Sequence, residues 1–116
     1  MKTARPFKVV LITAPNLKTA RRLARVALES RLVACVNLVP RVESHYWWQG
    51  RLERSAEVLL IAKTQKALLP RLEALILAEH PYDTPEFVVL PLEAGAARYL
   101  GWLAESTGKK PGKRRA

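Results

Sequence analysis

The chain has 116 residues, of which 49% are hydrophobic, and a formal net charge of +10. This length suits one globular domain and is too short for two. No apolar run approaches the roughly 20 residues of a membrane-spanning helix, the first residues lack the pattern of a signal peptide, and the single cysteine, Cys35, cannot form an internal disulfide. We therefore expect a cytoplasmic protein.

Five of the positive charges lie in residues 108–116, which contain no acidic residue, so the rest of the chain carries +5. We expect one domain over residues 1–107 and a disordered basic tail over residues 108–116. Nucleic-acid binding through this tail predicts steep salt dependence, but no base-reading motif supports it. Few Asn, Gln, Cys and Met residues beside plentiful arginine are compatible with a thermophilic source.

Residues 7–13 are nearly all apolar and rich in β-branched side chains, which predicts a buried strand. Asn16 is placed to cap a helix in which apolar residues recur at helical spacing. From Leu32 to Thr64 the pattern predicts two long strands joined by a tight turn at Gln49-Gly50.

Three aromatic residues, Tyr46, Trp47 and Trp48, fall beside that turn. Neighbouring strand residues point to opposite faces, so a small domain cannot easily bury all three rings. We expect them, with Trp102, to lie in an interface with a partner subunit. The alternative is that the rings fold back over helices of the same chain.

The second half has the same order of predicted elements as the first, without an internal sequence repeat. Residues 68–76 predict a helix with Pro70 in its first turn, residues 86–92 a last buried strand, and residues 96–106 a short helix. The order βαββαβα predicts an α+β fold of the ferredoxin-like kind, a four-stranded antiparallel sheet with helices on one face and an extra C-terminal helix.

The segment His80-Pro81-Tyr82-Asp83-Thr84-Pro85-Glu86 connects the second long helix to the last strand. Its two prolines fix their own φ and push the residues before them, His80 and Thr84, toward extended conformations. A stiff connector therefore presents an imidazole, a phenol, a hydroxyl and two carboxylates. This composition is typical of a binding site and also of a tight loop, and both interpretations stay open.

Lys63 ends an apolar strand and needs an anion nearby. Glu86 or a bound carboxylate or phosphate would supply one, which predicts a ligand cleft formed by Lys63, Tyr82, Thr84 and Glu86 with Trp48 as a wall. A structural ion pair between Lys63 and a glutamate is the simpler alternative. Cys35, inside an apolar strand, is expected to be a buried structural thiol.

Three motifs together are specific: Ala34-Cys35-Val36-Asn37, Tyr46-Trp47-Trp48-Gln49-Gly50, and His80-Pro81-Tyr82 followed by Thr84-Pro85-Glu86. With them, residues 7–106 resemble the CutA divalent-cation-tolerance proteins. The resemblance implies a ferredoxin-like fold, a homotrimer similar to the PII signalling proteins, a cytoplasmic location, and tolerance to copper and other divalent metals.

The chain departs from this family where metal ligands are concerned. In copper-binding members, the resemblance implies a cysteine just before the Thr-Ala-Pro segment and a His-His pair before Pro-Tyr. Here these positions hold Ile12 and the pair Glu79-His80. His80, Glu79 and Glu86 remain as candidate ligands, which suit Cu(II) or Zn(II) at modest affinity better than Cu(I). The alternative for His80 is an imidazole that interacts with the carbonyls at a helix end.

No nucleophile, phosphate-loop, dinucleotide-binding or zinc-protease motif is present, which argues against an enzyme. The leading hypothesis is a homotrimeric divalent-cation-tolerance protein that responds to metal ions and binds copper or another divalent cation, with no cofactor required for folding. The alternative is a PII-like signalling module that binds a small anion in the cleft between subunits and reports it to an unidentified protein partner.

Overall fold

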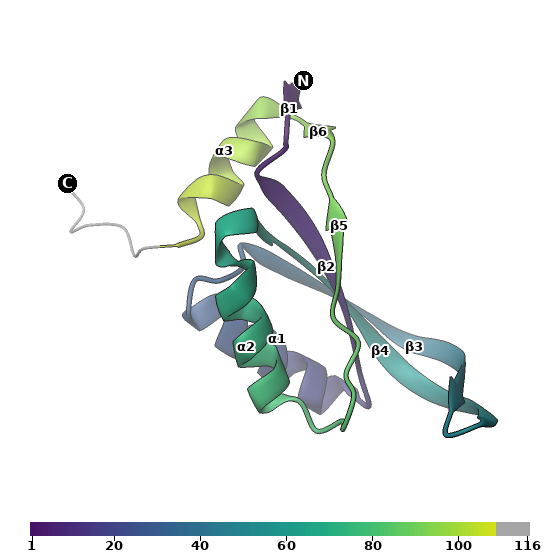
Figure 1. The fold of residues 1–116 in the computed structure, drawn as a ribbon. Helices are drawn as coiled ribbons and strands as arrows, with labels where there is room; N and C mark the ends of the chain where they lie inside the picture. Colours follow the sequence, from purple (N-terminus) through teal and green to yellow (C-terminus); the bar gives the residue numbers. More distant parts are fainter. Residues whose placement is uncertain (109–116) are drawn as a thin grey trace.

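The computed structural model describes residues 1–108 and contains two β-sheets and three α-helices (Figure 1). Residues 109–116, which hold nearly all of the predicted basic tail, lie outside the described residues. The elements in chain order are β1 (Lys2–Thr3), β2 (Phe7–Ala14), α1 (Leu17–Glu29), β3 (Cys35–Trp48), β4 (Arg51–Gln65), a 3-10 turn (Lys66–Leu68), α2 (Leu69–Glu79), β5 (Val88–Pro91), β6 (Ala94–Gly95) and α3 (Ala97–Glu105).

The main sheet has the strand order β3-β4-β2-β5, and every neighbouring pair is antiparallel. Helices α1 and α2 lie side by side over one face of this sheet (Figure 1). Strand order and helix placement are those of the ferredoxin-like fold, so the predicted fold is confirmed. The small sheet of β1 and β6 was not predicted, because two-residue strands are too short to show a periodic pattern.

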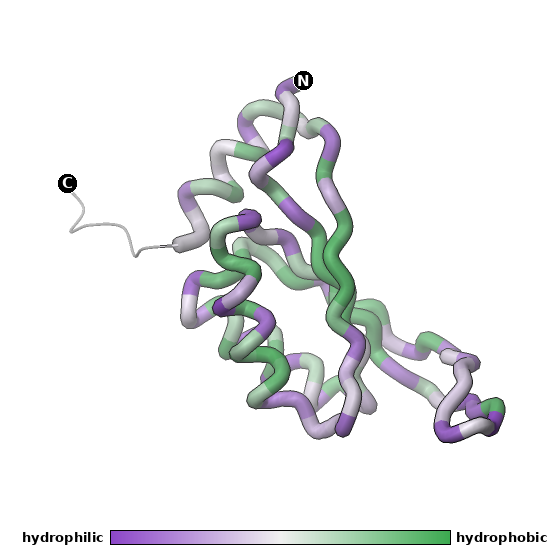
Figure 2. The backbone as a smooth tube through the Cα atoms, viewed as in Figure 1, coloured by the Kyte–Doolittle hydropathy of each residue, from purple (hydrophilic) through white to green (hydrophobic). Residues whose placement is uncertain are grey.

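The core lies between the sheet and these two helices. Alternate residues of β2 and β4, among them Val10, Ile12 and Leu60, point at Leu23 of α1 and Leu72 of α2, and each of the five is at most 2% exposed. Figure 2 shows hydrophobic residues concentrated where the central strands cross. This packing fixes the sheet and thereby the hairpin that extends from it.

Local sequence signals set the element ends as predicted. Asn16 caps α1, because its Oδ1 atom accepts a 2.8 Å hydrogen bond from the backbone N–H of Thr19. Pro70 lies in the first turn of α2, where its missing N–H leaves no helical hydrogen bond unmade. Asn16 and Pro70 therefore mark the N-terminal ends of the two helices, as the sequence predicts.

The face of the sheet opposite α1 and α2 is also apolar. Strand alternation turns Val9 and Leu11 of β2 and Leu59 and Ile61 of β4 toward it. The edge strand β5 leaves apolar side chains 37–45% exposed. Helix α3 packs at one end of the sheet, where it contacts β4. We call this uncovered side of the sheet the open face. Leu11 and Ile61 pair near its centre.

The hairpin of β3 and β4 extends well beyond the sheet and lengthens the molecule to 55 Å along its longest axis (Figure 1). Residues 51–57 of β4 pair with β3 alone, because β2 pairs with β4 from Val58 onward. Gln49 and Gly50 have φ values of 51° and 77°, as a two-residue hairpin turn requires. A bulge between Val39 and Val42, with Arg41 at φ 62°, separates this outer half of the hairpin from the inner half.

Candidate functional site

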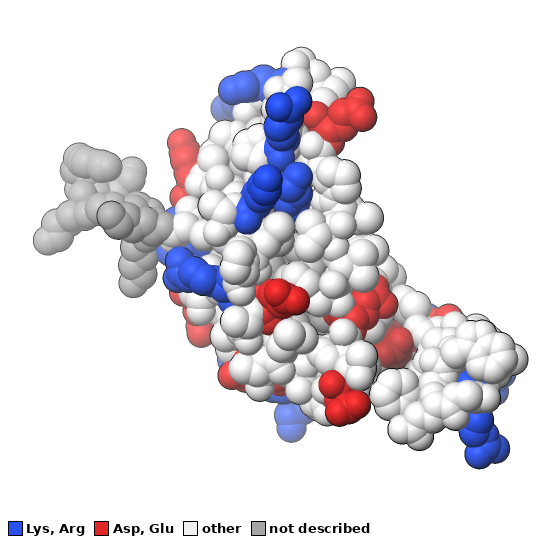
Figure 3. All heavy atoms as spheres, in the orientation of Figure 1, with Lys and Arg blue, Asp and Glu red and all other residues white. Residues whose placement is uncertain are grey.

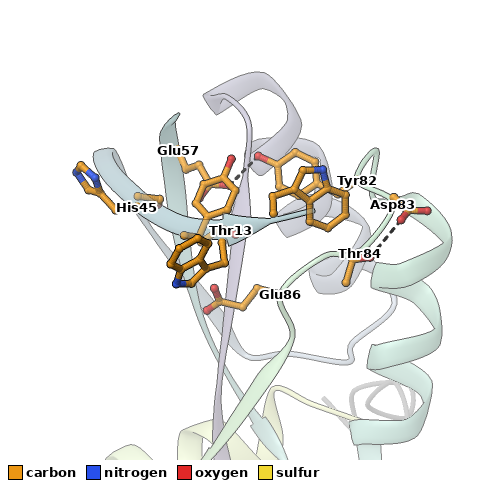
Figure 4. A pocket seen from close by; sticks show the side chains of 11 residues that line it. Thr13, His45, Glu57, Tyr82, Asp83, Thr84 and Glu86 are labelled. Atoms are coloured by element: carbon orange, nitrogen blue, oxygen red, sulfur yellow. Dashed lines mark hydrogen bonds between the residues drawn. The ribbon is translucent and has the colours of Figure 1, made fainter. Parts of the chain in front are cut away.

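An open pocket of about 750 Å³ lies between the outer half of the hairpin and the loop that follows α2 (Figure 4). The hairpin and the loop meet there because β2, which ends at Ala14, lies between β4 and β5 in the sheet. The lining comes from four segments: Thr13 of β2, residues 44–48 of β3, Glu57 of β4, and Tyr82, Asp83, Thr84 and Glu86 of the loop.

His80 fixes the start of the loop. Its ring is buried, with Nε2 2.7 Å from the carbonyl oxygen of Thr13 and Nδ1 3.1 Å from the backbone nitrogen of Tyr82. A carbonyl only accepts and an N–H only donates, so Nε2 carries the proton and Nδ1 accepts, which describes a neutral imidazole. Both ring nitrogens of His80 are therefore engaged within the chain.

Tyr82 connects the loop to the hairpin. Its ring centre lies 4.7 Å from that of His80, and its hydroxyl donates a 2.7 Å hydrogen bond to Oε2 of Glu57, a residue only 8% exposed. Burial, together with the hydrogen bond to Glu57 and the charge of that carboxylate, raises the pKa of the Tyr82 hydroxyl above its usual value. The hydroxyl therefore stays protonated and remains a donor to Glu57.

The pocket is acidic. Glu57, Asp83 and Glu86 line it, and no Lys or Arg is among its lining residues in the described part of the chain. Burial raises the pKa of the Glu86 carboxyl, and the negative charge of Glu57 raises it further. On the face drawn in Figure 3, Lys and Arg gather near the N-terminus, whereas Asp and Glu lie nearer the base of the hairpin. Such a field attracts cations and repels anions.

The three predicted metal ligands are not brought together. Glu79 accepts a 2.8 Å hydrogen bond from Arg22 through Oε1 and a 3.1 Å bond through its carbonyl oxygen, and both nitrogens of His80 are occupied. Only Glu86 lines the pocket. Within residues 1–108 no group of three His, Cys, Asp or Glu side chains is arranged to hold a metal ion. A copper site of the thiolate and imidazole type does not fit these residues.

Four of the five predicted cleft residues, Trp48, Tyr82, Thr84 and Glu86, line this one pocket. Lys63 does not. It lies six residues beyond Glu57 on β4, which at about 3.3 Å per residue is roughly 20 Å along the strand.

The surroundings of Lys63 also differ from the prediction. Its Nζ donates a 3.1 Å hydrogen bond to Oδ1 of Asn37 and lies 5.9 Å from the centre of the Tyr99 ring. Neither of the two ion pairs found within residues 1–108 involves Lys63, so the alternative of a structural Lys63–glutamate ion pair is not found there either. Cys35, expected to be buried, is half-buried with its Sγ 3.6 Å from the same Asn37 oxygen.

The predicted interface aromatics separate into two places. Tyr46, Trp47 and Trp48 all line the pocket, and Trp47 is 70% exposed. Trp102 lies on α3, away from the pocket, with its ring centre 5.4 Å from that of Tyr99. If these rings lie in a subunit interface, they must be exposed in a single chain, as they are here. The interface itself stays a prediction.

Glu57 and Thr13 are site residues that the sequence reasoning missed. Glu57 is a single acid at the start of the apolar run Val58-Leu59-Leu60-Ile61, and that position was its one available signal. A carboxylate is rarely buried in a strand without a polar partner, and Tyr82 is that partner here. Thr13 takes part through its backbone carbonyl, which carries no side-chain signal.

Comparison with known proteins gives one family. Residues 8–106 match the model of the CutA1 divalent ion tolerance protein. A Thermus thermophilus protein described as a divalent-cation tolerance protein CutA is 46% identical over 101 residues, which are 87% of this chain and 98% of that protein. A solved structure of the divalent cation tolerance protein from the same species has a TM-score of 0.86 and covers 88% of this chain and 99% of that one.

Two further relatives are described with other compartments. The chloroplastic CutA 1 protein of rice is 46% identical over 105 residues, which are 90% of this chain but 59% of the rice protein, so this chain spans about three fifths of it. A structure described as the periplasmic CutA protein of Archaeoglobus fulgidus is 36% identical with a TM-score of 0.84, covering 86% of this chain and 97% of that one. In residues 1–108 no helix is long and apolar enough to cross a membrane.

Proposed function

The chain belongs to the CutA1 divalent ion tolerance protein family, and from this premise we propose that it acts as a homotrimer whose acidic pocket binds a divalent cation. The observation that carries this proposal is that three carboxylates, those of Glu57, Asp83 and Glu86, line one pocket that has no Lys or Arg among its described lining residues. We propose no catalytic activity, and the cytoplasmic location stays a prediction.

Oxygen ligands define the chemistry of such a site. Glu57 and Glu86, with Asp83 beside them, offer carboxylates, which suit Mn(II), Mg(II) and, less specifically, Zn(II). Burial raises the pKa of the Glu86 carboxyl and the charge of Glu57 raises it further, and a bound cation would offset the effect of that charge. Because both ring nitrogens of His80 are engaged, the proposal assigns it the role of positioning Tyr82 and gives ligand roles to the carboxylates.

Two surfaces support the homotrimer. The open face presents apolar side chains along β2, β4 and β5. The outer hairpin adds Trp47 and Leu52, each 70% exposed. A two-stranded ribbon that protrudes from its core is only marginally stable alone, so packing against another copy would stabilise it.

An anionic ligand in the same pocket has less support. Three carboxylates would repel it, and Lys63, the cation expected to bind it, lies about 20 Å away along β4. A PII-like module of that kind would need cations contributed by another subunit.

The proposal is tested by calorimetric titration of chelator-treated protein with Mn(II), Zn(II) and Cu(II). We expect Glu86→Gln to weaken binding of Mn(II) by about tenfold, since one charged ligand is worth about 1.4 kcal/mol or more. Glu79→Gln is the matched control, because Glu79 pairs with Arg22 outside the pocket. Binding unaffected by Glu86→Gln but abolished by Glu79→Gln or His80→Ala would overturn the proposal and favour the ligand set predicted from the sequence.

A further inference from the structure

The pocket is larger than a metal ion with its bound waters would fill. Its volume of about 750 Å³ lies within the range of about 300–1,000 Å³ that is usual for small-molecule sites. One bound water occupies only about 30 Å³, so a cation with a few waters would leave most of this space unused. In addition, no preformed group of three metal-ligating side chains exists within residues 1–108.

Aromatic rings make up much of the wall. Tyr46, Trp47, Trp48 and Tyr82 line the pocket together with the carboxylates. Indole rings contribute no ligand to a hard metal ion, but their faces attract organic cations, by about 0.5–2 kcal/mol each. A wall of aromatic rings beside acids therefore fits an ammonium ion on an apolar stem better than it fits a bare metal ion.

The surroundings of Glu57 indicate which kind of ammonium ion fits the pocket. It is 8% exposed, and in the part of the chain that the structure describes its carboxylate accepts one side-chain hydrogen bond, from Tyr82 to Oε2. The other carboxylate oxygen, Oε1, has no side-chain donor among residues 1–108 and is not among the buried atoms that lack a partner, so a ligand in the pocket can reach it. An N–H donor would satisfy Oε1, and a quaternary ammonium ion has none.

We propose that this pocket, drawn in Figure 4, binds an organic ammonium ion of the alkylamine class. Its N–H groups would lie on Glu57 and Glu86 and its carbon stem against the rings of Trp48 and Tyr82. Glu57 and Tyr82 point toward each other from the hairpin and the loop in that view, with the Glu86 carboxylate facing the same space. The inference rests on the proposed function in one respect, that the pocket attracts cations.

The test is calorimetric titration of the full chain with cadaverine, and with tetramethylammonium as a cation that lacks N–H donors. We expect saturable binding of cadaverine and at least about tenfold weaker binding of tetramethylammonium. Trp48→Leu should weaken cadaverine binding by about fivefold and Trp48→Phe by less, since each loses part of the cation–π attraction. Trp102→Leu, on α3 outside the pocket, is the matched control and should bind as the unaltered protein does.

Absence of saturable cadaverine binding at about 10 mM would overturn the inference, and so would equal binding by Trp48→Leu and the unaltered protein. A side chain from a neighbouring copy in the pocket would produce the first of these results.

Parallel titration with Mn(II) separates the two proposals. Trp48→Leu should keep its Mn(II) affinity, whereas Glu57→Gln should lose affinity for both ions. If the unaltered protein binds Mn(II) but not cadaverine, this inference alone is refuted. If it binds cadaverine but not Mn(II), the proposed function alone is refuted.

Discussion

The hydroxyl of Tyr82 donates a 2.7 Å hydrogen bond to the buried carboxylate of Glu57, which lies 25 residues earlier in the chain. This bond joins the rigid loop after α2 to the base of the outer hairpin. Together with the His80 ring, which bonds to Thr13 and to the Tyr82 amide, it links three separate segments around one pocket. The pocket therefore depends on polar contacts as well as on the apolar core.

Removal of the Tyr82 hydroxyl should destabilise the protein. Tyr82→Phe leaves the buried Glu57 carboxylate without its donor, which should lower the free energy of unfolding by about 1–3 kcal/mol. Urea denaturation followed by circular dichroism measures this. Tyr46→Phe is the matched control, since the Tyr46 hydroxyl bonds to Ser55 in an exposed position and should contribute about 0.5 kcal/mol or less. Equal effects of the two substitutions would show that the buried bond has no special role.

His80 should act through hydrogen bonds to the chain. His80→Ala removes partners from the Thr13 carbonyl and the Tyr82 amide, and we expect a loss of about 2 kcal/mol in the free energy of unfolding. Nitrogen NMR of the imidazole should show the neutral tautomer protonated at Nε2. The same spectrum after addition of Zn(II) should be unchanged, and a shift of both ring nitrogens at stoichiometric metal would make His80 a ligand after all.

Glu86 should make stability and cation binding depend on pH in opposite directions. Its pKa is raised in the folded state, so the folded protein holds this proton more tightly than the unfolded chain does. The free energy of unfolding therefore falls as pH rises from the ordinary glutamate pKa, 4.5, through the higher folded value. Cation affinity should rise over the same interval, because the cation displaces the proton.

Thermal unfolding between pH 4 and pH 7 checks the stability effect. Glu86→Gln should make the unfolding temperature less dependent on pH in that interval. Glu73→Gln, an exposed substitution on α2, should leave the pH dependence as it is. Identical pH profiles for Glu86→Gln and the unaltered protein would show that burial and Glu57 do not perturb Glu86.

A charge on the open face should dissociate the proposed homotrimer. Ile61 lies near the middle of that face, opposite Leu11, so Ile61→Lys would bury an ammonium in the subunit interface. Light scattering after gel filtration should give three times the chain mass of 13.1 kDa for the unaltered protein and about one chain mass for Ile61→Lys. Leu77→Lys, an equally drastic change on the exposed side of α2, should remain trimeric. A monomeric unaltered protein would refute the trimer.

The fold was predictable because its signals are local. The Asn16 cap, the Gln49-Gly50 turn and the alternation of apolar residues each act over a few positions, and their order leaves few topologies. The bulge at Arg41 was not predictable, because a non-glycine residue with positive φ leaves no regular pattern.

Part of the pocket lining could be grouped from the sequence, and part could not. The loop residues Tyr82, Thr84 and Glu86 share one rigid segment, so proximity in sequence was enough to group them. Which strand residues meet this loop depends on the register of β4, and the sequence did not distinguish Glu57 from Lys63 as the residue beside it. Strand spacing then separates those two positions by roughly 20 Å.

The central claim is that the carboxylates of this pocket bind the cation, and paramagnetic broadening by Mn(II) in NMR spectra tests it most directly. With substoichiometric Mn(II), we expect the amide signals of Glu57, Asp83, Thr84 and Glu86 to broaden first, while that of Lys63 persists. Broadening centred on any other part of the chain, or none at concentrations where calorimetry detects binding, would contradict the claim.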